Sequence, residues 1–159
     1  MTLCPFVDFS TYNSQNPFGQ FDGKYYPATK HHIGSDFKVP VGTPIKAPAD
    51  GGMLKAAFNS ARGNTGIFVF TCEGIEWGIE FCHLKQKPPL GTYKQGETIA
   101  FTGNTGSATT GAHLHVTLHK DAMVTKNYSL LTSEAAFVQL WRDGRIADPY
   151  LWFWQKINN

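Results

Sequence analysis

Two apolar runs in the middle of the chain, GIFVFTC (66–72) and IEWGIEFCHL (75–84), are joined by only two residues, Glu73 and Gly74. Runs rich in β-branched and aromatic residues favour strands, and a two-residue connection that contains glycine is typical of a tight hairpin. Because the two strands of such a hairpin are antiparallel, this feature predicts an antiparallel sheet at the centre of the fold.

The rest of the chain is expected to supply further short strands. Residues 97–103 (ETIAFTG) and 113–119 (HLHVTLH) favour two of them, and residues 37–58 alternate short apolar pieces with Gly and Pro turns. The 16 Gly and 9 Pro also favour many turns over long helices. We therefore expect a mainly β fold, formed as a single domain around an antiparallel sheet.

One helix is expected, late in the chain, over residues 132–143. It has a Thr or Ser cap, Glu134 in its first turn, apolar residues at helical spacing and Gly144 as a stop signal. Residues 1–31 are loop-like, because they are dense in Asn, Pro, Gly and aromatic residues. The aromatic tail DPYLWFW is expected to pack back on the sheet.

Length and charge exclude several classes of protein. A chain of 159 residues suits one domain with a real core, and we expect a monomer. The net charge is +2 and the basic residues are scattered, so nucleic acid is not an expected partner. No stretch approaches the roughly 20 apolar residues of a membrane span. The first residues lack the basic and apolar regions of a signal peptide.

The three cysteines, Cys4, Cys72 and Cys82, are not expected to form a disulfide framework, because their number is odd. Cys72 should lie near the turn of the central hairpin and Cys82 near its far end. At about 3.3 Å per strand residue, this separation exceeds the span of a disulfide. Both are predicted to be buried free thiols, and no CxxC zinc knuckle is present.

The stretch GAHLHV (111–116) carries the first candidate functional residues. In a strand, alternate side chains share a face, and the intervening apolar residues should face the core. The polar face should therefore carry His113, His115, Thr117 and His119. Two adjacent imidazoles suit either a joint role at one metal ion or a metal ligand next to an acid/base.

Possible partners lie upstream in HHIGSDF, which contains His32 and Asp36 with Gly34 between them. Glycine disfavours a helix and gives the backbone freedom to bring the imidazole and the carboxylate together. Nitrogen and oxygen ligands of this kind suit Zn²⁺. Two histidines and one carboxylate would leave a fourth position open for water, as in catalytic zinc sites.

A third candidate, His83, ends the run WGIEFCHL, where strand alternation places it on the face of Trp77, Ile79 and Phe81. A histidine at a strand end is often only a hydrogen-bonded edge residue. His31 and His119 are interpreted as surface or supporting residues. Each of the three motifs, HLH, HIGSD and CHL, is weak evidence for a functional site when taken alone. Their occurrence together, in this order, is hard to attribute to chance.

Taken together, these motifs resemble the lysostaphin/LytM-type zinc endopeptidases of peptidoglycan. The resemblance runs from NPFGQF through HHIGSDFKVPVGTPIKAPADGG, EFCHL and GETIAFTGNTGSATTGAHLHV to ADPYLW, and so from residue 16 to residue 152. It implies one metallopeptidase domain over residues 1–159. Its core would comprise residues 17–119 and 147–154, with a helical insertion at 120–146.

The resemblance also implies a fold and a site. The fold would be a twisted antiparallel sheet related to the duplicated hybrid motifs, with a groove walled by loops. His32, Asp36 and His115 would hold one Zn²⁺, and His113 and His83 would be the catalytic pair beside it. The substrate would be the peptides of bacterial peptidoglycan, and the missing leader would fit a phage lysin or virion-borne enzyme as well as a bacterial one.

The proton transfers would fall to imidazole, because the sequence has no His-Glu-x-x-His motif that could provide a glutamate base. Zinc should lower the pKa of its water from 15.7 towards about 7. The unperturbed histidine pKa of about 6.5 suits general acid–base work near neutrality. His113 and His83 are expected to activate the water and stabilise the oxyanion, with their individual roles left open.

Two other functions remain open at this point: a catalytically inactive fold member that activates a cell-wall amidase, and a zinc hydrolase of another peptide. The presence of all five site residues disfavours the first. No wall-binding module accompanies the domain, which favours cleavage of the D-alanyl–diaminopimelate cross-link over glycyl-glycine cleavage. Insertion 120–146 and Cys82 depart from the family pattern. Tyr25 or Tyr26 could line the groove, but packing in the core or in the loop is favoured for them.

Overall fold

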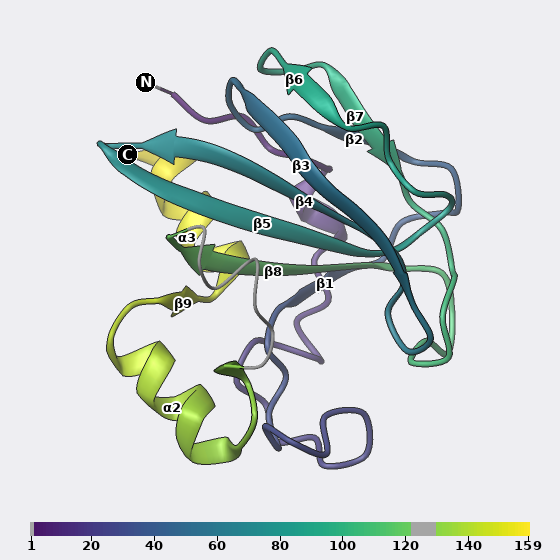
Figure 1. The fold of residues 1–159 in the computed structure, drawn as a ribbon, viewed down its shortest axis with the longest axis vertical. Helices are drawn as coiled ribbons and strands as arrows, with labels where there is room; N and C mark the ends of the chain where they lie inside the picture. Colours follow the sequence, from purple (N-terminus) through teal and green to yellow (C-terminus); the bar gives the residue numbers. More distant parts are fainter. Residues whose placement is uncertain (1, 122–129) are drawn as a thin grey trace.

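The computed structural model describes residues 2–121 and 130–159 of the chain. Within them, a seven-stranded antiparallel sheet has the path β1-β8-β5-β4-β3-β6, with β9 paired to β8, and a two-stranded sheet pairs β2 with β7 (Figure 1). The strands are β1 (Ser35–Phe37), β2 (Pro44–Lys46), β3 (Gly51–Asn59), β4 (Gly63–Cys72), β5 (Ile75–Leu84), β6 (Gly91–Tyr93), β7 (Thr98–Phe101), β8 (Leu114–Lys120) and β9 (Ile146–Ala147). The predicted mainly β, single-domain antiparallel fold is confirmed.

The central hairpin forms as predicted. Strands β4 and β5 are joined by Glu73 and Gly74, whose φ angles of 52° and 76° are both positive. A turn with two positive φ angles has the twist that matches right-handed strands, so the connection can be this short. Both long strands twist strongly across the molecule (Figure 1). The strands predicted at 97–103 and 113–119 are also present, as β7 and β8.

The main core lies on one face of the sheet and is centred on aromatic rings. Phe6 is fully buried and meets Phe37, Phe81 and Phe153 edge-on, at ring-centroid distances of 5.3, 5.7 and 5.1 Å. Edge-to-face contacts of this kind add stability beyond the buried area. The N-terminal segment, with a short 3₁₀ helix η1 (Phe9–Thr11), is thus part of the core rather than a free arm.

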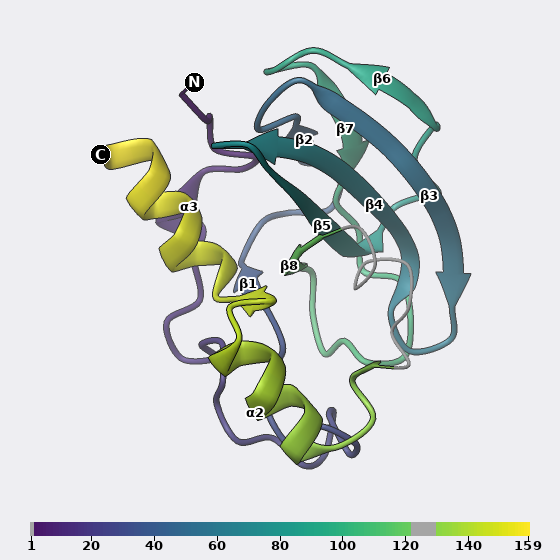
Figure 2. The ribbon, with the colours of Figure 1, turned by 60° about the vertical axis from the view of Figure 1, so that its left-hand side comes forward.

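Two helices follow one another along one side of the molecule (Figure 2). The predicted helix over 132–143 is present as α2 (Glu134–Arg142), capped by the Ser133 side chain, which accepts a hydrogen bond from the Ala136 N–H. Its buried Phe137 belongs to a second, smaller apolar cluster that also contains Phe18.

The second helix, α3 (Pro149–Asn158), is not predicted from the sequence, which places only an aromatic tail there. The Asp148 side chain accepts from the Leu151 N–H, and proline occupies the first turn, which is a common start for a helix. The tail does pack against the sheet, through Phe153, but as a helix.

The cysteine prediction is confirmed, since Cys4, Cys72 and Cys82 are all free and the last two are buried. No helix in the described ranges is long and apolar enough to cross a membrane. Part of the expected insertion, residues 122–129, lies outside the described residues.

Candidate active site

Asp36 and His115 meet because β1 and β8 are antiparallel and pair these two residues directly. Their side chains share one face of the sheet, and Nδ1 of His115 lies 2.9 Å from Oδ1 of Asp36. The neighbours Phe37 and Leu114 point to the opposite face and belong to the main core. Strand register therefore fixes the spacing of the imidazole and the carboxylate.

His32 reaches the same point from the loop that precedes β1. Its Nε2 lies 3.4 Å from Oδ1 of Asp36 and 3.2 Å from Nδ1 of His115. The His32 backbone N–H donates to the carbonyl oxygen of Gln20, which ties the loop down. All three side chains are buried. The structure thus brings together the three residues that the resemblance assigns to the metal.

Gly34 is needed for a reason other than the predicted backbone freedom. A Cβ at this position would lie 2.0 Å from the Val116 carbonyl oxygen and 2.8 Å from Cε1 of His115. Its φ is not positive, so the conformation itself is open to other residues. The constraint is the close approach of this segment to β8, which only a residue without a side chain permits.

The three ligand atoms fit a tetrahedral zinc ion. Their separations of 2.9, 3.2 and 3.4 Å bracket the edge of about 3.3 Å that follows from metal–ligand distances of 2.0–2.1 Å. Among the residues that the structure describes, this is the one group of three such side chains whose ligand atoms lie within 4.8 Å of one another. Two nitrogens and one carboxylate oxygen also match the ligand chemistry of zinc.

Neighbouring groups orient the ligands of this cluster. Nδ1 of His32 lies 3.2 Å from the Pro17 carbonyl oxygen and donates to it, so Nε2 is the nitrogen that would face a bound metal ion. Nε2 of His115 lies 3.1 Å from the Thr117 hydroxyl. Asn16 donates from Nδ2 to Oδ2 of Asp36 at 2.7 Å, leaving Oδ1 for the cluster. Outer partners of this kind are a regular part of metal sites.

Burial and charge set the protonation of the cluster. Burial lowers the pKa of His115 to about 4, despite the opposing effect of Asp36. Burial alone would raise the pKa of Asp36, but hydrogen bonds from His115 and His32 outweigh it and hold that pKa far below its usual range. For His32, burial lowers the pKa, and the hydrogen bond and charge of Asp36 more than reverse this. Asp36 is therefore anionic at neutral pH, as a carboxylate that binds a metal ion must be.

His83 lies beside the cluster, on the opposite face from the one that strand alternation predicts. Its φ of 59° is left-handed, and the pairing of β4 with β5 shifts register opposite it, between Asn64 and Gly66. Such an irregularity re-aims one side chain. The His83 ring comes to lie 4.8 Å from that of His113 and 6.4 Å from that of His115.

His83 and His113 are held in the same tautomer. Nδ1 of His83 lies 2.7 Å from the Thr105 carbonyl oxygen, and Nδ1 of His113 lies 2.8 Å from that of Gly111. A carbonyl oxygen only accepts, so both Nδ1 atoms carry the hydrogen and both Nε2 atoms offer a lone pair. Nε2 of His113 is 3.9 Å from Oδ1 of Asp36. Burial lowers the pKa of His83, which favours its neutral form.

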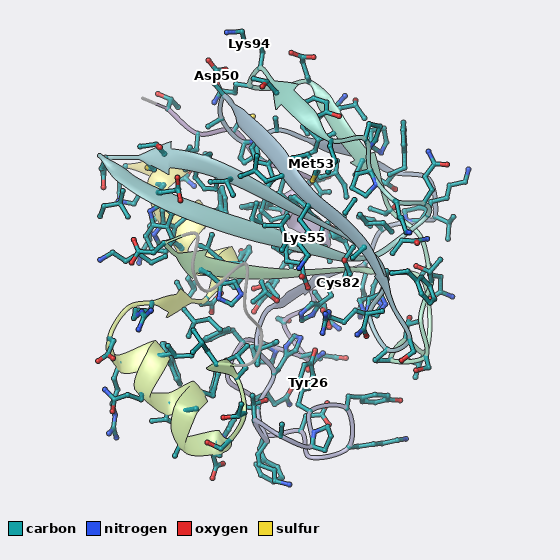
Figure 3. All side chains as sticks on the ribbon, viewed as in Figure 1. Tyr26, Asp50, Met53, Lys55, Cys82 and Lys94 are labelled. Atoms are coloured by element: carbon teal, nitrogen blue, oxygen red, sulfur yellow. The ribbon has the colours of Figure 1, made fainter. Side chains whose placement is uncertain are left out.

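Two cavities, of about 380 and 270 Å³, lie at this site and share part of their lining. Both are lined by Tyr25, Tyr26 and His83, whereas Asp36 lines the first and His115 the second. The two tyrosines therefore line the groove, which is the alternative to the core or loop packing that the sequence favours. Tyr26 lies below the sheet and Cys82 on the sheet above it (Figure 3).

The remaining two histidines are not part of the cluster. His31 bridges the loop to α2, with Nε2 2.7 Å from Oε2 of Glu134 and Nδ1 2.8 Å from the Gly19 carbonyl oxygen. His119 is fully buried at the far end of β8 rather than on the surface. Sequence reasoning also missed Asn16, because nothing in the sequence links a loop asparagine to a carboxylate twenty residues away.

Comparison with known proteins identifies the family. Residues 30–127 match the description of peptidase family M23. The chain belongs to peptidase family M23. It is 44% identical over 90 residues to an uncharacterized metalloprotease of Haemophilus influenzae, covering 55% of this chain and 18% of that protein. It is 36% identical over 97 residues to the peptidoglycan DD-endopeptidase ShyC of Vibrio cholerae, covering 58% of this chain and 22% of ShyC.

The M23 fold extends over most of the chain. The catalytic domain of the antimicrobial peptidase lysostaphin from Staphylococcus simulans superposes with a TM-score of 0.61 at 20% identity, covering 91% of this chain and 94% of that domain. The predicted resemblance to the lysostaphin type is thereby confirmed at the level of family and fold. The chain spans only about a fifth of the length of the two curated relatives.

Proposed function

We propose that this M23 peptidase is a zinc-dependent endopeptidase that cuts peptide bonds in bacterial peptidoglycan. The observation that carries the proposal is the buried cluster of His32, Asp36 and His115, with His83 and His113 beside it at the groove. Three protein ligands leave an open coordination position, as catalytic zinc sites do. The name of the relative ShyC, a peptidoglycan DD-endopeptidase, supports the substrate class.

His32 would bind zinc through Nε2, His115 through Nδ1 and Asp36 through Oδ1, since these atoms face one another. The bound ion would supply Lewis-acid activation of water and polarisation of the scissile carbonyl. The protein's part is to present two neutral ligands and one charged ligand in a buried pocket, where burial keeps His115 unprotonated.

The proton transfers would belong to His83 and His113. In the neutral enzyme both present Nε2 lone pairs toward the groove, because their Nδ1 hydrogens are bound by backbone carbonyls. One imidazole can take a proton from the attacking water and the resulting imidazolium can donate it to the leaving nitrogen or to the oxyanion. The ring spacing of 4.8 Å lets both act on one reacting centre.

Cleavage within a chain requires room on both sides of the scissile bond. Asp36 faces one cavity and His115 the other, so the cluster lies between two parts of the groove. This arrangement supports endopeptidase action, and we propose the D-alanyl–diaminopimelate cross-link as the bond that is cut.

The proposal can be tested with purified protein, zinc and isolated cell walls. We expect one zinc per chain and the release of uncross-linked muropeptides, identified by mass spectrometry. Zinc-loaded protein that releases nothing from walls but stimulates a cell-wall amidase would instead identify an activator. Cleavage of free peptides without cleavage of walls would identify a peptidase of another substrate class.

A further inference from the structure

The two halves of the groove differ in chemistry. The smaller cavity has an apolar wall, contributed by Pro27, Ala28, Ile33, Ala61, Leu131 and the shared Ala108. Thr29 and Arg62 also line it, and the Arg62 side chain is paired with Glu80 at 3.3 Å. The larger cavity is lined mainly by polar groups, among them Asn13, Asn16, Asp22, Lys38, Thr109 and Thr110. A peptide that lies across the cluster would therefore place a small apolar residue on one side and a polar residue on the other.

Lys38 is the cationic side chain of the polar half, and the proposed chemistry does not use it. It follows Asp36 by two residues and lines the same cavity as Asp36 and His113. Its backbone N–H donates to the Thr11 carbonyl oxygen, which fixes the base of an exposed side chain. Among the described residues Lys38 forms no ion pair, and no other lysine or arginine lines this cavity.

Two acidic residues line this cavity, of which Asp36 belongs to the cluster and Asp22 is engaged within its own loop. Oδ1 of Asp22 accepts hydrogen bonds from the backbone N–H groups of Lys24 and Tyr25, both at 3.1 Å. Asp22 thereby stabilises the turn in the loop that forms the groove wall. The Lys38 ammonium group is left to bind an anion that enters with the substrate.

We propose that Lys38 is a specificity-determining residue, which binds a free carboxylate on the residue that supplies the nitrogen of the scissile bond. This inference rests on the proposed endopeptidase function. Peptidoglycan offers such a carboxylate in two places: on the diaminopimelate centre of a cross-link, and on the last residue of an uncut D-alanyl-D-alanine stem. Within a glycyl-glycine bridge no free carboxylate lies beside the scissile bond, so Lys38 would disfavour that substrate.

The apolar half of the groove fits the other side of the same bond. The residue on the carbonyl side is D-alanine in both substrates, and its methyl group matches a wall of alanine, isoleucine and leucine side chains. Together the two halves would fix the direction in which the peptide lies across the cluster.

The test compares matched substrates that differ only in the carboxylate. Two pairs are used: a stem peptide ending in D-alanyl-D-alanine against its carboxamide, and a cross-linked dimer with free against amidated diaminopimelate. A hydrogen bond to a charged group contributes about 1.5–3 kcal/mol, so wild type should prefer the acid roughly 10- to 100-fold in kcat/KM. The pair with the larger preference identifies which carboxylate source the enzyme uses.

Two variants complete the design. Lys38→Gln should lose the preference by slowing cleavage of the acid while leaving the amide unchanged. Lys94→Gln is the control and should retain the preference, because Lys94 lies beside Asp50 at the far end of the sheet from Tyr26 (Figure 3). A Lys38→Gln enzyme with an undiminished preference, or a wild type without one, would overturn the proposal.

Binding separates this inference from the proposed function. Chemical-shift titration of the product D-alanine and its amide into zinc-loaded protein needs no turnover. If the protein cuts nothing, yet binds the acid more tightly than the amide in a Lys38-dependent way, then the endopeptidase proposal fails and the carboxylate site stands. Equal binding of D-alanine and its amide would show that the proposed carboxylate site does not exist, whether or not the protein has endopeptidase activity.

Discussion

Gly34→Ala should destroy the proposed metal centre although it replaces none of the three ligands. The new Cβ would lie 2.0 Å from the Val116 carbonyl oxygen, whereas carbon–oxygen contacts normally begin at about 3.3 Å. The segment carrying His32 and Asp36 must therefore move about 1.3 Å away from β8, and zinc sites tolerate errors of only about 0.2 Å in ligand distance. Overpacking of this kind also costs about 1–3 kcal/mol, or roughly 2–12 °C in Tm for a chain of this size.

The assay is zinc content together with thermal unfolding with and without zinc. A ligand that binds only the folded state raises its stability, by about 2.7 kcal/mol at a hundredfold excess over Kd. Wild type should show this increase and Gly34→Ala should not. Gly23→Ala is the matched control, because its Cβ would meet only Phe21 Cζ at 3.9 Å. Stoichiometric zinc of unchanged affinity in Gly34→Ala would refute the argument from close approach.

Much of the fold could be predicted because its signals are local. The hairpin is determined by two strand-forming runs and a two-residue turn, and the face of β8 that carries His115 follows from simple alternation. The start of helix α3 could also have been predicted, because Asp148 is a favourable N-cap residue and Pro149 a favourable first helical residue. From the sequence, this segment is instead expected only to pack on the sheet as an aromatic tail. The burial of Phe6 depends on contacts with three distant segments, and no local pattern in a loop-like stretch reveals it.

Parts of the candidate site could not be predicted, because they depend on non-local geometry. A single left-handed residue turns His83 from the core face to the groove, and alternation cannot anticipate it. The need for Gly34 arises from a strand that lies eighty residues further along the chain. Asn16 and Tyr26 act from loops whose course is determined only by the folded structure, so their places at the cluster and the groove carry no sequence signature.

Two further variants test the surroundings of the cluster. Asn16→Ala removes the hydrogen bond to Oδ2 of Asp36 and should therefore weaken zinc binding about 10- to 100-fold. The affinity can be measured by competition with a chromogenic chelator. An unchanged zinc affinity would show that Asn16 does not help to orient Asp36. Burial lowers the pKa of His119 to about 3, whereas in the unfolded chain it is about 6.5. The unfolded state then binds the extra proton, so stability should fall as pH drops from about 6.5 to about 3, by up to about 1.4 kcal/mol per pH unit from this residue. Denaturant titrations of His119→Gln should show a shallower fall, and an identical slope would mean that His119 is not the group responsible.

We propose that His115 binds zinc whereas His113 transfers protons. The most direct test is to measure zinc content and wall lysis in the same His113→Ala preparation. The three ligands remain, so zinc should stay at one per chain, while lysis should fall by about 10²–10⁴-fold with the loss of acid–base help. His83→Ala should behave alike, and the double variant should lose less than the product of the two single losses if both imidazoles act on one water and one oxyanion. Bound zinc with near-normal lysis in His113→Ala would contradict the account.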